Sequence, residues 1–192
     1  MNFATEMKLF SHWKYWIMNN KRIALLSILT GATVLGRIVM APVPNVQPVT
    51  VILIFLSIYM GLLDALIVNA LVMFISNIYL GFGPWTFYQI LSYSIIIFLS
   101  FFLSKIKKFK NSMLLQTVFA AFSGIFYGFI ISIFTAAMFS KTSNFFVYYL
   151  NGLYFDIMHG VGNAVLYVLL IPPLKAALIK YKKLWLSLTY LL

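Results

Sequence analysis

The chain has 192 residues, of which 63% are hydrophobic and 9% are charged, with a formal net charge of +11. A soluble domain is usually about half apolar and about a quarter charged, so this composition excludes an ordinary soluble protein and indicates a membrane protein. Cysteine is absent, which excludes disulfides, thiolate catalysis, iron–sulfur clusters and cysteine zinc sites. The length predicts a single integral-membrane domain over 1–192.

The N-terminal segment mixes aromatic side chains such as Phe10 and Trp13 with Lys8 and Lys14. This mixture is typical of a helix that lies on the inner leaflet of a membrane. The segment lacks the apolar core and small-residue cleavage site of a signal peptide. We therefore expect 1–20 to be retained as an interfacial segment.

The first membrane span is predicted at 23–41, because this apolar run ends at Pro42 and Pro44, which cannot continue a helix. A stripe of small residues shares one face of the span: Ala24, Ser27 and Gly31. Such stripes let helices approach closely in lipid, either inside a bundle or against another membrane protein.

The next apolar run, 49–80, is too long for one span. As a single helix it would measure about 48 Å, against a hydrocarbon core of about 30 Å. We expect it to turn at the sequence GLLD, 61–64, where Asp64 is expected to cap a helix, so that it forms a second and a third span. The Gly/Pro-rich sequence GFGPW, 81–85, then ends the third span.

Three further spans follow, at about 86–104, 113–139 and 149–173, the last ending at a Pro-Pro pair. The chain is therefore predicted to be an all-α membrane protein, a compact bundle of six transmembrane helices over 23–173. A cytoplasmic or interfacial tail is expected over 174–192.

The basic residues predict the orientation of the bundle. Six spans place both termini on one side, and of the 14 Lys and Arg residues only Arg37 and Lys141 fall on the other side. Cytoplasmic loops carry the excess of positive charge, so both termini are expected in the cytoplasm, with the chain in the cell membrane of a bacterium. The connectors 41–48, 81–85 and 140–148 then face outward. The basic charge is explained by topology, and no nucleic-acid partner is expected.

Catalytic motifs are absent. The chain has no nucleophile elbow, zinc-binding helix, P-loop or dinucleotide motif, so we expect no enzyme activity and no ATP hydrolysis by this chain. The acids Glu6, Asp64 and Asp156 fall at different depths, which argues against a pair of catalytic carboxylates. A metal site would need more ligands than one Asp and one His, so none is expected.

The strongest polar cluster is NGLYFDIMHGVGN, 151–163, in the outer half of the sixth span. Asp156 and His159 share a helical face, and ionisable residues inside a span indicate function by default. The alternative is that the two side chains pair and only hold helices together. Arg37, one turn before the first outer connector, has three possible roles: to reach outward to water, to pair with Asp156, or to hold a ligand group.

The outer connectors also combine aromatic rings with amides. An interfacial aromatic belt explains several of these rings, but rings beside amides also suit a mostly apolar ligand pocket with a few orienting polar groups. The predicted substrate-binding residues are Arg37, Asn45, Gln47, Trp85, Tyr88, Gln89, Tyr149, Asn151, Asp156 and His159.

Three segments, GRIVMAPVPNVQPVT (36–50), LGFGPWTFYQ (80–89) and FDIMHGVGNA (155–164), together with the six-span, basic-inside pattern, resemble the S components of energy-coupling factor (ECF) vitamin transporters, a branch of the ABC class. The nearest likeness is to the cobalamin-specific type, and folate or pantothenate are alternative ligands. The resemblance covers most of the chain.

The resemblance implies a vitamin ligand taken from outside, a membrane-embedded coupling protein and two cytoplasmic ATPases that use ATP. It also implies that the S component topples in the membrane to release its vitamin. In that family small residues of the first helix, usually AxxxA, contact the coupling protein. Here Ile28 stands four residues after Ala24, so the role is carried to Ala24, Ser27 and Gly31.

Two other functions stay open on sequence alone. Asp156 and His159 would serve a stand-alone proton-coupled carrier, although such carriers are expected to have inverted repeats or interrupted helices, and no clear internal symmetry is present. A membrane-embedded hydrolase using the same two residues would lack a credible nucleophile.

Overall fold

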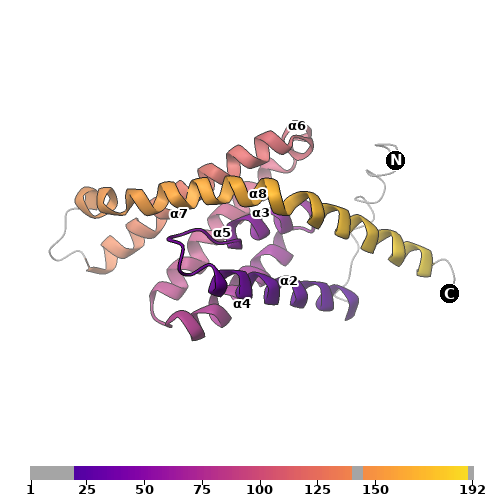
Figure 1. Cartoon of the computed structure of the whole chain (residues 1–192), viewed down its shortest axis with the longest axis horizontal. Helices are drawn as coiled ribbons and strands as arrows, with labels where there is room; N and C mark the ends of the chain where they lie inside the picture. The colour runs from indigo at the N-terminus through magenta and orange to yellow at the C-terminus, as the bar shows by residue number, and fades with distance from the viewer. Residues whose placement is uncertain (1–19, 140–144, 190–192) are drawn as a thin grey trace.

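The computed structural model describes residues 20–139 and 145–189, all of it helices and connecting turns with no strand. The helices are α2 (Asn20–Val39), α3 (Val49–Tyr59), α4 (Leu62–Leu80), α5 (Trp85–Leu103), α6 (Lys107–Asn111), α7 (Met113–Phe139) and α8 (Phe145–Thr189) (Figure 1). The predicted interfacial segment, apart from Asn20, and Lys141 lie outside the described residues. The all-helical fold class is confirmed.

Five of these helices are long and apolar enough to cross a membrane: α2, α4, α5, α7 and α8. The chain is therefore a multi-pass membrane protein. Two of the predicted turns follow from glycine, because Gly61 before α4 and Gly81 after it have φ angles of 126° and 110°, which other residues rarely adopt. The predicted bounds of the fifth span, 113–139, coincide with α7.

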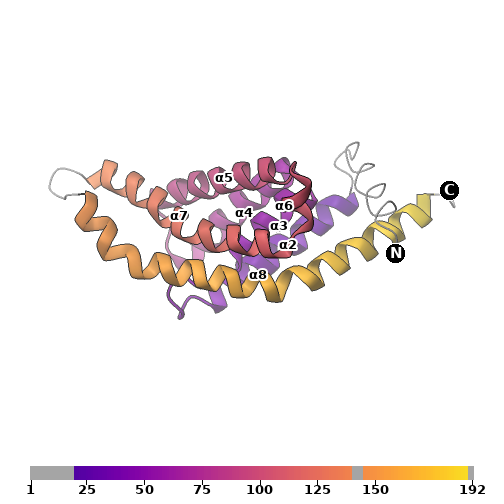
Figure 2. The same cartoon turned by 90° about the horizontal axis from the view of Figure 1, so that it is seen from above.

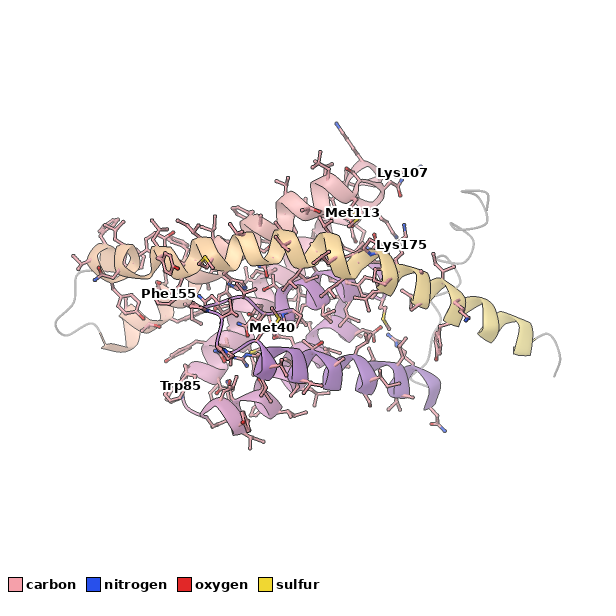
Figure 3. All side chains as sticks on the ribbon, in the orientation of Figure 1. Met40, Trp85, Lys107, Met113, Phe155 and Lys175 are labelled. Atoms are coloured by element: carbon pink, nitrogen blue, oxygen red, sulfur yellow. The ribbon has the colours of Figure 1, made fainter. Side chains whose placement is uncertain are left out.

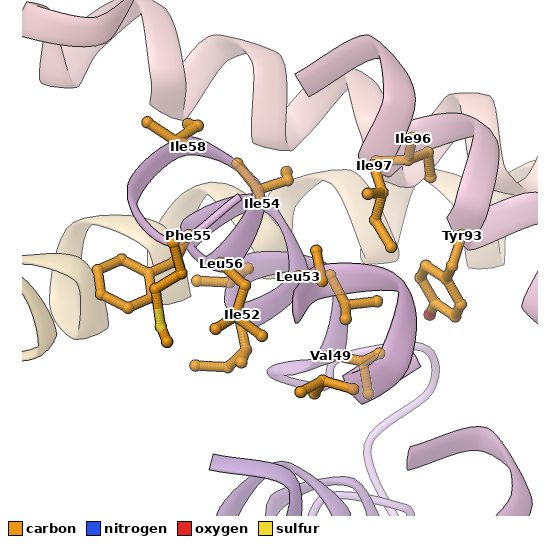
Figure 4. Packing of buried hydrophobic residues seen from close by; sticks show 14 of the residues in the cluster. Val49, Ile52, Leu53, Ile54, Phe55, Leu56, Ile58, Tyr93, Ile96 and Ile97 are labelled. Atoms are coloured by element: carbon orange, nitrogen blue, oxygen red, sulfur yellow. The ribbon is translucent and has the colours of Figure 1, made fainter. Parts of the chain in front are cut away.

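The predicted second span corresponds to a shorter apolar helix, so the predicted count of six is roughly consistent with five long helices and this one. α3 has 11 residues, and at 1.5 Å per residue its length of about 17 Å is well below the hydrocarbon thickness of about 30 Å. All of its residues are buried, because it contacts α2, α4, α5, α7 and α8. Figure 4 shows Leu53 and Ile54 of α3 beside Ile97 of α5. The apolar character of 49–59 thus serves packing within the protein.

The predicted end of the sixth span at Pro172 and Pro173 is wrong. α8 continues through both prolines to Thr189, so the residues predicted as a separate tail, up to that point, extend the same helix. Both proline side chains are exposed on the helix surface, and Figure 2 shows a helix that bows without breaking. A proline removes one backbone hydrogen bond, a loss that long membrane helices tolerate when their neighbours support them.

The two ends of the molecule differ in chemistry. The basic end, which carries Arg22, lysines 105–110, Lys175 and Lys180, is formed by the start of α2, the region of α6 and the later part of α8. The connector end is formed by residues 41–48, residues 81–84 and the start of α8. Figure 3 shows Lys107 and Lys175 toward one end of the long axis, and Trp85 and Phe155 toward the other.

At the basic end, Asp64 does not cap α4 as predicted: the N-cap residue is Gly61, and the side chain of Asp64, in the first turn of the helix, forms an ion pair instead. Arg22 donates hydrogen bonds from Nε (3.0 Å) and Nη2 (2.6 Å) to Oδ1 of Asp64, which is fully buried. The pair joins the start of α2 to the start of α4. Removing only one partner of a buried ion pair lowers the free energy of unfolding by about 3 to 5 kcal/mol, because the other charge is left buried without a partner.

Gln116 forms a second buried junction near the same end. Its Oε1 accepts hydrogen bonds from the hydroxyls of Tyr59 (3.2 Å) and Tyr167 (2.8 Å). Its Nε2 donates to the backbone carbonyls of Phe109 (3.0 Å) and Lys110 (2.8 Å). One amide therefore holds α3, α6, α7 and α8 together.

Candidate functional site

Arg37 is the centre of a buried polar cluster at the connector end. It lies in the last turn of α2 and is only 6% exposed. The guanidinium donates to Oε1 of Gln47 (3.1 Å), to Oδ1 of Asn77 (3.1 Å) and to Oγ of Ser76. Two of the three roles considered for Arg37 are therefore not adopted, because the side chain neither reaches out to water nor pairs with Asp156.

The charge of Arg37 has no carboxylate partner among the residues that the structure describes, where Arg22–Asp64 is the one ion pair. Neutral amide and hydroxyl oxygens accept from Nε and Nη1 without neutralising the charge. A buried cation in this state would gain from an anionic or strongly polar ligand group. The position therefore fits the third role, holding a group of a ligand.

Asn77 extends the cluster from α4 to α5. Its Nδ2 donates to Oγ1 of Thr86 (2.9 Å) and to Oε1 of Gln89 (2.7 Å). The amide side chains of Gln47, Asn77 and Gln89 and the guanidinium of Arg37 thus form one hydrogen-bonded chain across the 41–48 connector, α2, α4 and α5. The amides can offer both donors and acceptors, and the guanidinium can offer donors, to a ligand that replaces these internal hydrogen bonds.

His159 anchors the other half of the cluster. Its Nε2 lies 2.8 Å from Oγ1 of Thr50 in the first turn of α3, and both residues are buried. The imidazole packs edge-on against Tyr127 of α7, with 5.3 Å between ring centroids, and Tyr127 stacks on Tyr93 of α5 at 4.4 Å. Tyr93 follows Gln89 by four residues on the same face of α5, so the two halves of the cluster adjoin.

The expected pair between Asp156 and His159 does not form. Their spacing allows contact, but His159 bonds across to Thr50, while Asp156 packs against Gly128 of α7. A Cβ atom added at Gly128 would overlap the carboxyl group of Asp156, so this glycine provides the space that the carboxyl occupies. Oδ2 of Asp156 is buried and has no hydrogen-bond partner in the described part of the chain.

The connector 41–48 lies against α8 beside the cluster. Nδ2 of Asn45 donates to the carbonyl of Phe155 (3.2 Å), and Asn45 has a φ angle of 54°, a left-handed conformation that Asn adopts more readily than most residues. A Cβ atom at Gly162 would lie 3.0 Å from the side chain of Val46. The connector therefore packs against α8, and Gln47 links it directly to Arg37.

The remaining predicted residues lie around this cluster. Tyr88 stacks on Phe134 of α7 with 5.4 Å between ring centroids, and Tyr149 stacks on Phe145 at 6.0 Å. Trp85 is half exposed and donates from Nε1 to the carbonyl of Gly81 (3.2 Å). Asn151 is exposed. Trp85 and Tyr88 lie in the first turn of α5, and Tyr149 and Asn151 in the first two turns of α8; these four residues are called the rim below.

Several members of the cluster were missed by sequence reasoning: Thr50, Ser76, Asn77, Tyr93, Tyr127 and Gly128. The adjacent Ser76 and Asn77 carried a usable signal, since two polar residues deep in an apolar span are costly unless they are paired. The others became meaningful only through contacts between distant helices.

A cavity between α2 and α8 lies outside this cluster. Its volume is about 580 Å³, and none of the ten predicted binding residues lines it. A ligand that bonds to Arg37 would compete with the hydrogen bonds that Gln47 and Asn77 now accept from it.

No protein-family model matches the chain, and neither a curated protein nor a solved structure matches it. The function is therefore argued from the residues of the site and from the sequence resemblance.

Proposed function

We propose that the chain is the substrate-binding S component of an energy-coupling factor transporter and that it captures a vitamin at the connector end. The observation that carries the proposal is the buried guanidinium of Arg37 directly behind the Pro-rich connector: it is held by amides and has no carboxylate partner among the described residues. Ionisable groups inside a membrane protein are costly and indicate function by default.

The chemistry of the site favours a ligand with amide or carboxylate groups on an extended body. Arg37, Gln47, Asn77 and Gln89 supply the polar contacts, and the rim tyrosines Tyr88 and Tyr149 supply aromatic surface, a combination typical of small-molecule pockets. Cobalamin, with its amide side chains, is our first choice, and folate and pantothenate are the alternatives. The protein needs no cofactor of its own in this scheme.

Binding would exchange internal hydrogen bonds for ligand bonds. Release of Gln47 from Arg37 frees the connector 41–48, and its three prolines limit the conformations that the freed chain samples. Little ordering entropy is then lost when the connector closes on the ligand. Arg37 would hold an acidic or amide group of the vitamin at the bottom of the site.

Transport would depend on partner proteins. With the basic end in the cytoplasm of a bacterial cell, both termini and the partner ATPases lie on the same side. The small-residue stripe Ala24, Ser27 and Gly31 is exposed on α2, and no atom lies within 4 Å of a Cβ added at Gly31. This open face fits the membrane-embedded coupling protein. The chain itself carries out no catalysis.

The direct experiment is to identify what co-purifies with the protein. The full chain, expressed in a bacterium supplied with the three vitamins and extracted in mild detergent, is denatured and its small molecules are measured by mass spectrometry. One vitamin is expected at about the molar amount of the protein, and Arg37→Gln should lose it. Equal recovery from both proteins, or no vitamin at all, would argue against the proposal.

A proton-coupled carrier is the second candidate, because Asp156 carries a buried carboxyl oxygen without a partner in the described residues. Reconstituted alone in liposomes, such a carrier would move its substrate under a pH gradient. An S component would do so only with its coupling protein and ATPases. Flux abolished by Asp156→Asn in the absence of partners would favour the carrier.

A further inference from the structure

The groove between α2 and α8 is separate from the polar cluster. It is a cavity of about 580 Å³, with Pro48 and Ile52 of α3 among its lining residues. On one side α2 contributes Leu29 and Gly36, followed by Met40 just after its end, and on the other side α8 contributes Leu170, Leu174 and Ala177. Its single polar side chain, Thr33, donates its hydroxyl to the carbonyl of Leu29 (2.6 Å) and offers no polar group to a ligand.

The groove opens toward the bilayer and has the length of one leaflet. Ala32, Pro173 and Ala177 line it and are exposed, and Figure 1 shows α2 and α8 both running along the molecule. From Leu166 to Ala177 helix α8 rises about 17 Å. Half of the hydrocarbon thickness is about 15 Å, so an acyl chain of one leaflet spans the groove.

A lysine stands at the end of the groove. The lining face of α8 runs through Leu170, Leu174 and Ala177, and three residues further the same face reaches Lys180 at the basic end. Lys180 is exposed, and neither acid of the described residues is near enough to pair with it, since Asp64 pairs with Arg22 and Asp156 belongs to the connector end. Lys175, by contrast, lies over the ring of Tyr59 at 5.7 Å.

We propose that this groove binds one acyl chain of an anionic phospholipid, whose phosphate is held by Lys180. The apolar lining recognises the chain, and the lysine distinguishes an anionic from a zwitterionic head group. The groove shares Pro48 with the 41–48 connector, but none of its lining residues takes part in the hydrogen bonds of the polar cluster, so the proposal does not rest on vitamin capture. A lipid seated here would fix the distance between α2 and α8.

The test uses the purified full chain and native mass spectrometry with equimolar phosphatidylglycerol and phosphatidylcholine. The natural chain should retain one lipid and prefer phosphatidylglycerol. Lys180→Gln should lower this preference about fivefold, the effect of one lysine near an anionic lipid. Lys107→Gln, at the same end but on α6, is the matched control and should change the preference little.

A second pair of variants tests the groove itself. Ala32→Trp should fill it and remove the retained lipid of either kind, whereas Leu35→Trp, exposed on the same helix outside the groove, should keep it. If Ala32→Trp fails to fold, Ala177→Trp makes the same test from α8. The proposal would be overturned if Ala32→Trp retained lipid as well as the natural chain, or if a protein dimer appeared in place of bound lipid. It would also be overturned if the natural chain showed no preference for phosphatidylglycerol, or if Lys180→Gln and Lys107→Gln changed that preference equally.

Discussion

Nε of Arg37 lies 3.1 Å from Oε1 of Gln47, so the buried cation at the end of α2 is tied directly to the Pro-rich connector that follows it. The same guanidinium reaches Ser76 and Asn77 of α4. One side chain thus joins the 41–48 connector to helix α4. Any ligand that competes for this guanidinium changes how the connector is held.

Replacing Arg37 by lysine should keep the positive charge and lose the planar arrangement of donors that serves Gln47 and Asn77 together. Hydrogen bonds to charged groups contribute about 1.5 to 3 kcal/mol each, so we expect vitamin affinity to fall by at least tenfold. Titration of the purified variant with the vitamin measures this loss. Lys105→Arg, at the basic end, is the control and should bind normally. Undiminished binding by Arg37→Lys would show that the planar set of guanidinium donors does not hold the vitamin.

Gly128→Ala should destabilise the protein, because the new Cβ overlaps the carboxyl of Asp156. Overpacking of this kind costs about 1 to 3 kcal/mol. Gly152→Ala is a matched control on α8, where no atom lies within 4 Å of the added Cβ and where alanine is the better helix former. Thermal unfolding in detergent is the measurement. Adding Asp156→Ala to Gly128→Ala should restore most of the loss, and additive losses would contradict the contact.

Gln116→Leu should also destabilise the bundle. It removes the acceptor of the Tyr59 and Tyr167 hydroxyls and the donor to two backbone carbonyls. A buried polar group left without its partner costs about 1 to 3 kcal/mol, so the unfolding temperature should fall by about 2 °C or more. Thr117→Val serves for comparison, since the Thr117 hydroxyl bonds only to the carbonyl of Met113 in its own helix. Equal melting of the two variants would show that Gln116 does not hold the helices.

Gly31→Leu should leave vitamin binding intact and slow uptake, since Gly31 lies on the exposed face of α2, away from Arg37's partners. Uptake is measured in vesicles that contain the coupling protein and ATPases, and binding is measured on the isolated chain. Val118→Phe adds comparable bulk on the exposed face of α7 and should affect neither. Normal uptake by Gly31→Leu would exclude this face as the docking surface.

The sequence was sufficient to predict most helices and turns, because long apolar runs and the glycines at 61 and 81 determine them locally. It was not sufficient for α3, since apolar residues packed against protein and apolar residues facing lipid look the same. Pro172 and Pro173 predicted an end that α8 does not have, because support from neighbouring helices is invisible in one segment.

For the candidate site, the sequence identified Arg37, Gln47, Gln89 and His159 as polar residues in unusual places. Their partners depended on tertiary contacts. The spacing of Asp156 and His159 favoured a pair, yet the imidazole forms its hydrogen bond with Thr50, more than one hundred residues away in the chain. The spacing of residues within one helix shows which side chains could meet there. It does not show whether a residue from another helix will bond instead.

The central claim is that the isolated chain binds a vitamin through Arg37. Calorimetric titration of the purified, ligand-free protein with cobalamin, folate and pantothenate in turn tests it most directly. We expect one of the three to bind at one site per chain with micromolar affinity or better, and Arg37→Gln to abolish the signal while the protein still folds. If none of the three produces binding to the folded natural chain, the assignment as a vitamin-binding S component is wrong.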